Sequence, residues 1–204
     1  NSGDLSVKSN NGSVIVSNVN VSGNVEMMAE NIELGQAIVG GATRINSAGR
    51  LTAKTIQSQQ QLSLVALGEL LVEEASSVVD DIVAISSGSM RFDTVTAAND
   101  IQLDAAGSLM ASKIESSAGS IELRAQGDIE LDQLVAVLEG FTATSAGAVS
   151  IQSAVAKTSA KVVSGSDLTI DNAKAESLDL ESQGGDVTNQ RSEAGRMRIA
   201  AVGT

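Results

Sequence analysis

The chain has 204 residues, a formal charge of −12, and neither cysteine nor histidine. The lack of cysteine excludes a disulfide framework and thiolate chemistry, and the lack of histidine excludes nucleophile triads that use it. The excess of acidic residues argues against non-specific nucleic-acid binding, which needs stripes of Lys and Arg, and no apolar run approaches the roughly 20 residues of a membrane helix.

The first predicted strands lie in residues 5–21. Apolar side chains occur in residues 5–7 and 14–16, and Val19 adds a third apolar site. The turn signal Asn11-Gly12 separates the first two segments, since both residue types tolerate positive φ. Apolar and polar residues that alternate with period two are typical of a half-buried β-strand. The segment therefore predicts one coil with three short strand sites.

The three apolar sites of this first coil recur along the whole chain with a nearly constant step of about 19 residues. The first site holds Leu5, Val25, Thr43, Leu62, Ile82, Ile101, Ile121, Phe141, Ala160, Leu178 and Met197. The second site holds Val14, Ile32, Leu51, Leu70, Met90, Leu109, Ile129, Val149, Leu168 and Val187. The third site holds Val19, Ile38, Ile56, Ala75, Val95, Ile114, Leu134, Ala154, Ala173 and Ser192. A fixed period of this kind indicates a stacked repeat architecture.

Three positions along the repeat need individual attention. Thr43 replaces an aliphatic residue at the first site, so its hydroxyl needs a backbone partner inside the core. In the ninth coil we expect Ala160 and Val162 to point inward, which leaves Lys161 in solvent. Asn189, like Ser192, takes an inward position near the end of the chain, and strand pairing is expected to be looser there.

The repeat predicts an all-β fold, a right-handed parallel β-helix (β-solenoid). Each coil has about 19 residues and three short strands, and residues 1–204 form about ten and a half coils of a single continuous domain. Right-handed winding is the usual sense for parallel crossovers. At about 4.8 Å per coil the rod is roughly 50 Å long. A β-sandwich remains an alternative, because strands at this spacing also occur there.

Acidic residues precede many of the predicted strands. These residues are Asp4, Asp81, Asp100, Asp128, Asp167 and Asp186. One interpretation is a ladder of calcium ligands, because hard cations prefer clustered oxygens. The other is that each Asp closes a turn by accepting hydrogen bonds from its own backbone. No metal site and no cofactor are predicted.

Three outward carboxylates lie close together in the sequence, namely Glu122, Glu130 and Asp132. Paired carboxylates are the groups that cleave glycosidic bonds, and parallel β-helices can carry sugar-cleaving sites. The alternative is a solvated strand face. Because Tyr and Trp, which stack on sugars, are absent, we predict no catalytic residue.

Several outward strand positions are apolar, including Ile15, Leu71, Val83 and Met110. Leu71 and Val83 lie in neighbouring coils, so they predict a patch that contacts a partner or a second filament. Single apolar residues scattered over a surface are also normal, and that alternative stays open.

The repeat resembles the roughly 19-residue repeats of filamentous haemagglutinin and of the stalks of contact-dependent growth inhibition exoproteins. The resemblance is carried by residues 3–7, 14–16, 119–123 and 128–131, and it extends as a repeat pattern over nearly the whole chain. It implies a large exoprotein that an outer-membrane partner secretes and that is displayed as a filament. The secretion domain of that family carries an Asn-Pro-Asn-Gly signature, whereas this chain has no Pro, so the resemblance implies a piece of the shaft.

These observations predict a structural and adhesive shaft segment rather than an enzyme. The resemblance implies a secreted spacer at a bacterial cell surface, whose parent protein contacts its secretion partner and a host or neighbouring cell, and we expect a monomer. No nucleic-acid partner and no membrane span are expected. The alternatives are a carbohydrate-active β-helix, such as a polysaccharide lyase or hydrolase, and a phage tail-spike shaft.

Overall fold

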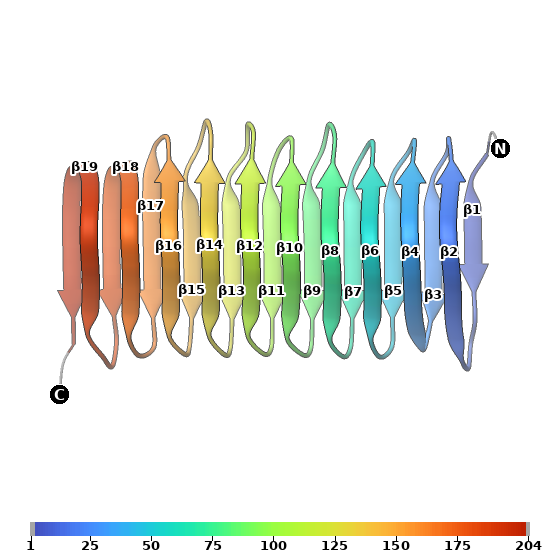
Figure 1. The fold of residues 1–204 in the computed structure, drawn as a ribbon, viewed down its shortest axis with the longest axis horizontal. Helices are drawn as coiled ribbons and strands as arrows, with labels where there is room; N and C mark the ends of the chain where they lie inside the picture. The colour runs from blue at the N-terminus through green and yellow to red at the C-terminus, as the bar shows by residue number, and fades with distance from the viewer. Residues whose placement is uncertain (1–2, 203–204) are drawn as a thin grey trace.

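The computed structural model describes residues 3–202 as one stack of β-strands wound around a common axis (Figure 1). The short strands are β1 (Leu5–Lys8), β3 (Val25–Ala29), β5 (Thr43–Ser47), β7 (Leu62–Ala66), β9 (Ile82–Ser86), β11 (Ile101–Ala105), β13 (Ile121–Ala125), β15 (Phe141–Ser145) and β17 (Ser159–Ser164). The long strands are β2 (Ser13–Val21), β4 (Asn31–Val39), β6 (Leu51–Ser58), β8 (Leu70–Ser77), β10 (Met90–Ala97), β12 (Leu109–Ser116), β14 (Ile129–Ala136) and β16 (Val149–Ala156). In the last coils both kinds fuse into β18 (Leu168–Ser182) and β19 (Val187–Ala201).

Every strand pairs in parallel with the equivalent strand of the next coil. In the short-strand ladder Ile101 pairs with Ile121 and Ile121 with Phe141, while in the long-strand ladder Leu109 pairs with Ile129. In Figure 1 the near strands run upward and the far strands downward as the chain advances from right to left, which is a right-handed winding. The predicted β-solenoid is therefore confirmed, and equivalent positions of successive coils lie about 19 residues apart.

The second and third predicted strand sites share one continuous strand. In β14 the adjacent residues Asp132 and Gln133 are both exposed, between the buried Leu131 and Leu134. This interruption of the alternation marks a bend, and the parallel pairing continues on both sides of it. The two sites are close together in the sequence, which leaves no room for a separate turn between them.

The core is a single column of stacked side chains, mostly Ile, Leu, Val and Ala, with Met27, Met90, Phe92 and Phe141 among them. The ladder positions predicted from the sequence pair as expected, with one exception in the second coil. The third site there is Ala37, which is fully buried and pairs with Ile56, whereas Ile38 is 37% exposed. The prediction of Ile38 was wrong because the step from Val14 to its partner Ile32 is one residue shorter than the next step, so the third site is reached one residue earlier.

The three unusual positions have different outcomes. Thr43 is buried, and its hydroxyl donates to Ser58 Oγ at 3.2 Å, so its partner is a side chain rather than the backbone. Ala160 is buried and Lys161 is exposed, as predicted. Among the described residues, Asn189 Oδ1 is the one buried side-chain polar atom without a hydrogen bond, yet β18 and β19 pair along almost their whole length. The expectation of looser pairing there was wrong, because the ladder depends on backbone groups.

Buried serines at the corners connect successive coils, and the sequence analysis missed them. Ser116 Oγ, for example, donates to Asn99 O of the preceding coil at 2.6 Å and lies 2.8 Å from Gly119 O of its own turn. The buried serines of the described chain are Ser47, Ser58, Ser77, Ser86, Ser116, Ser145, Ser164 and Ser182. Each donates to a turn carbonyl of the preceding coil, so these polar groups are satisfied inside the stack.

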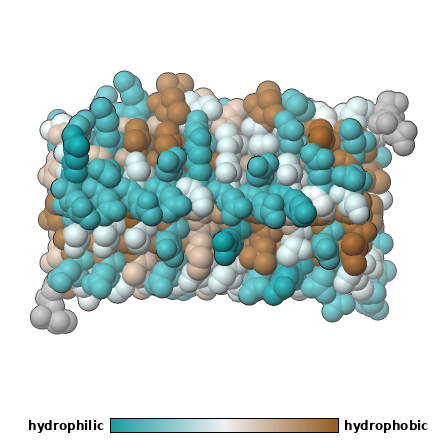
Figure 2. All heavy atoms as spheres, in the orientation of Figure 1, coloured by the Kyte–Doolittle hydropathy of each residue, from teal (hydrophilic) through white to brown (hydrophobic). Residues whose placement is uncertain are grey.

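The long strands form one face of the rod, and its middle carries a band of mostly hydrophilic side chains along the axis (Figure 2). Within residues 3–202 the fold contains no helix that is long and apolar enough to cross a membrane. The candidate site described below lies on the face that the long strands form.

Candidate functional site

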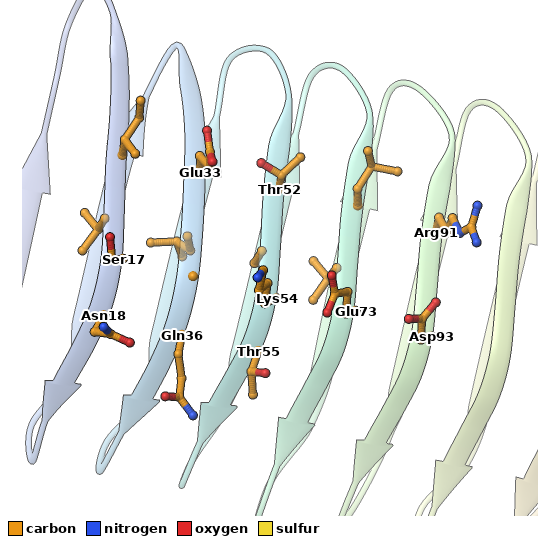
Figure 3. Close-up of a pocket in the computed structure, with 17 residues that line it drawn as sticks. Ser17, Asn18, Glu33, Gln36, Thr52, Lys54, Thr55, Glu73, Arg91 and Asp93 are labelled. Carbon is orange, nitrogen blue, oxygen red and sulfur yellow. The ribbon is translucent and has the colours of Figure 1, made fainter.

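A shallow groove of about 980 Å³ runs along the long-strand face, across β2, β4, β6, β8 and β10 (Figure 3). It follows the bend of the long strands, where two consecutive residues of each strand face solvent. We call this surface the axial groove. Its charged side chains are Glu33, Lys54, Glu73, Arg91 and Asp93, and its apolar ones include Ile15 and Leu71.

The strand register orders these side chains into two rows along the axis. The upper row contains Ile15, Glu33, Thr52, Leu71 and Arg91, which pair with one another in that order and continue to Met110. A second row lies one strand step further on and contains Lys54, Glu73 and Asp93. Figure 3 labels Glu33, Thr52 and Arg91 of the upper row and Lys54, Glu73 and Asp93 of the second row.

The charged side chains of the axial groove have no partners of their own chain. Within residues 3–202 none of the five forms an ion pair within 4.0 Å or a side-chain hydrogen bond. Elsewhere on the surface, pairs such as Lys113–Glu115 and Arg198–Asp179 are formed at 2.6 Å and 3.0 Å. The groove therefore presents both signs of charge to an external polar partner.

The two residues of the predicted contact patch lie on different faces. Leu71 lies on β8 in the axial groove, half-buried between Thr52 and Arg91. Val83 lies on β9, which belongs to the short-strand ladder on the far side in Figure 1, and pairs with Ser63. The structure therefore does not bring them into one patch, and a partner contact at either residue stays a prediction.

The acidic turn residues connect neighbouring coils. Asp100 Oδ1 accepts a hydrogen bond from Ser120 N of the next coil at 2.7 Å, and Asp128 Oδ1 accepts one from Ala148 N at 2.8 Å. Asp4, Asp81 and Asp167 do the same, so their partners lie in the next coil rather than in their own turn. Across residues 3–202 no three acidic side chains gather as a metal site.

Replacing Asp100 with Ala is expected to lower the free energy of unfolding by about 1 kcal/mol, because Ser120 N then loses its acceptor. Asp100→Asn should retain most of the stability, since Asn24 and Asn31 accept the equivalent bonds in other coils. Urea denaturation measures both changes. Asp104→Ala is the control, because Asp104 faces outward on β11. An equal loss in Asp104→Ala would contradict the role of the turn carboxylate.

The three carboxylates considered for sugar cleavage are not brought together. Glu122 lies on the short strand β13 and forms an ion pair with Arg124. Glu130 and Asp132 lie on the long strand β14, where Asp132 Oδ1 accepts a hydrogen bond from Gln152 Nε2 at 3.0 Å. Glu122 and Glu130 therefore face solvent on different sides of the rod.

The sequence analysis missed the axial groove apart from Ile15 and Leu71, which it named as outward apolar residues. Its charged residues occupy ordinary outward positions, and their common location depends on the bend and on the register between coils. Comparisons of the chain with protein-family models, curated proteins and solved structures found no match, so the assignment of function rests on the fold and its surface.

Proposed function

We propose that the chain is a structural and adhesive shaft segment of a large secreted bacterial surface exoprotein, of the filamentous haemagglutinin kind. In that role it is a rigid spacer that presents distal binding or toxin modules. The parent protein would be exported by an outer-membrane partner and would contact a host or neighbouring cell through its other parts.

The observation that supports this role is the continuity of the two backbone ladders. Parallel pairing connects every coil from β1 to β19 without a break in the described chain. Each coil contacts mainly its neighbours, and the stacked aliphatic core continues from Val14 to Leu180. In such an architecture stiffness and length scale with the number of coils.

A distance measurement between the ends tests the spacer role. Asn18 and Arg191 occupy the same ladder position nine coils apart. Spin labels on Asn18→Cys and Arg191→Cys in one chain, diluted with unlabelled protein, should give a single narrow distance of about 43 Å, nine spacings of about 4.8 Å. A broad distribution, or one centred far below this distance, would contradict a stiff spacer.

A carbohydrate-active function is the second candidate, and the axial groove is the observation that favours it. Glu33, Glu73 and Asp93 place carboxylates along an open channel that crosses five long strands. Incubation with a panel of polysaccharides should release no reducing or unsaturated sugar ends if the chain is a spacer. If the wild-type chain releases sugar ends and Glu73→Gln does not, the spacer proposal is wrong and the chain is a carbohydrate-active protein.

A tail-spike shaft is the third candidate. It predicts that the mass in solution is that of a trimer.

A further inference from the structure

Four of the five charged side chains of the axial groove form two opposite-charge matches when the order of the coils is reversed, whereas Asp93 falls opposite Gly35. In the upper row Glu33 of the second coil matches Arg91 of the fifth, and Thr52 lies opposite Leu71. In the second row Lys54 of the third coil matches Glu73 of the fourth. The centre of this pattern lies between β6 and β8.

We propose that the axial groove is a homodimer interface, in which a second copy of the chain lies antiparallel on the same face. The two-fold axis runs parallel to the strands, between β6 and β8. A contact of this symmetry places residue i of one copy opposite residue j of the other, and residue j opposite residue i, so each match occurs twice. The proposal departs from the expected monomer and is independent of the spacer function.

Glu33 and Arg91 find their partners across this axis. Glu33 and Arg91 are three coils apart on one ladder, about 14 Å along the axis, so they cannot contact each other within one chain. In the dimer each Glu33 faces the Arg91 of the other copy. The Lys54 and Glu73 side chains extend from the second row and meet their counterparts beside the two-fold axis.

The ends of the interface are apolar. Ile15 is 71% exposed on β2, and Met110 is 43% exposed on β12, at the same ladder position five coils further on. The two-fold axis places Ile15 of one copy opposite Met110 of the other. The contact therefore covers two apolar side chains at each end of the charged centre.

The overall charge also favours this face for self-association. Each chain carries −12, so two copies repel each other at long range. The charged side chains of the axial groove are two cations, Lys54 and Arg91, and three carboxylates, Glu33, Glu73 and Asp93, so its net charge is only −1. No like charges face each other in the dimer.

The size of the face fits a weak dimer. Six coils at about 4.8 Å span about 29 Å, and the residues of each long strand that line the groove, at most four, cover about 13 Å, which gives about 400 Å² per copy. The total of about 800 Å² lies below the range of stable interfaces, so we expect a transient dimer that dissociates at about hundreds of micromolar.

Charge reversal tests the proposal by sedimentation velocity. The mass of the wild-type chain should rise from 20.7 kDa toward twice that value as the concentration is raised from about ten to about several hundred micromolar. Glu33→Arg alone and Arg91→Glu alone should each weaken the dimer by about 100-fold or more, because each creates two like-charge contacts. An equimolar mixture of these two variants should dimerise within about tenfold of the wild type, since the mixed pair restores both contacts. Glu26→Arg, on the short-strand ladder outside the interface, should behave as wild type.

The mixture distinguishes this dimer from other arrangements. Residues 33 and 91 are too far apart to contact each other within one chain, so the mixture can restore dimerisation only if they meet across the interface. A monomeric wild type, single variants that dimerise normally, or a mixture that stays monomeric would each overturn the proposal. A second measurement does not depend on the charge variants. Under mild oxidation Ile15→Cys combined with Met110→Cys in one chain should form a disulfide-linked dimer, whereas either cysteine alone should not. Absence of that crosslink would also overturn the antiparallel register.

Discussion

Deletion of residues 121–140 is expected to leave a folded protein whose rod is shorter by about 4.8 Å. The deletion removes one whole coil, so Phe141 then stacks on Ile101 and Val149 on Leu109, in the same ladders that they occupy now. Because each coil contacts mainly its neighbours, the new junction repeats an existing one. Circular dichroism should remain that of β-structure, and small-angle scattering should report the shorter rod.

Deletion of only residues 121–130 is the matched control. It places long-strand residues at short-strand positions, so that Gln133 falls at the inward position of Leu123 and Leu134 at the outward position of Arg124. We expect loss of the cooperative unfolding transition in the coils that follow the junction. If the whole-coil deletion unfolds as completely as the half-coil deletion, the modular account of the fold is wrong.

The second large effect is expected from a charge in the core. Ala143 is fully buried between Leu123 and Val162 of the adjacent coils, so Ala143→Asp places a carboxylate among aliphatic side chains. An unpaired buried charge of this kind should lower the free energy of unfolding by more than about 4 kcal/mol. Urea denaturation followed by circular dichroism measures the loss.

Thr144→Asp provides the comparison for this substitution. Thr144 is the next residue of β15, is exposed, and pairs with Arg124 of the preceding coil. The same change at this position should alter stability by less than about 0.5 kcal/mol, because the carboxylate is solvated and lies near a cation. Similar losses for the two variants would contradict the assignment of inward and outward faces.

Much of the fold follows from a local signal that needs no knowledge of the tertiary structure. Apolar side chains such as Ile101, Ile121 and Phe141 recur at one period, and a stack of coils is the arrangement that buries them all. The alternation around Lys161 likewise assigns its face correctly. Where two apolar residues are adjacent, as at Ala37 and Ile38, the period alone cannot choose between them, because the coils are not all of equal length.

The sequence by itself determined the repeat, the parallel β-solenoid and the inward face of nearly every strand, because these depend on side-chain periodicity. Only the tertiary structure decided which outward residues are neighbours. It separated Leu71 from Val83, directed Asp100 to the next coil, and placed Glu33, Lys54, Glu73 and Arg91 along one groove. The physical reason is that the outward positions carry no burial constraint, so their grouping depends on the bend of the long strands and on the register between coils.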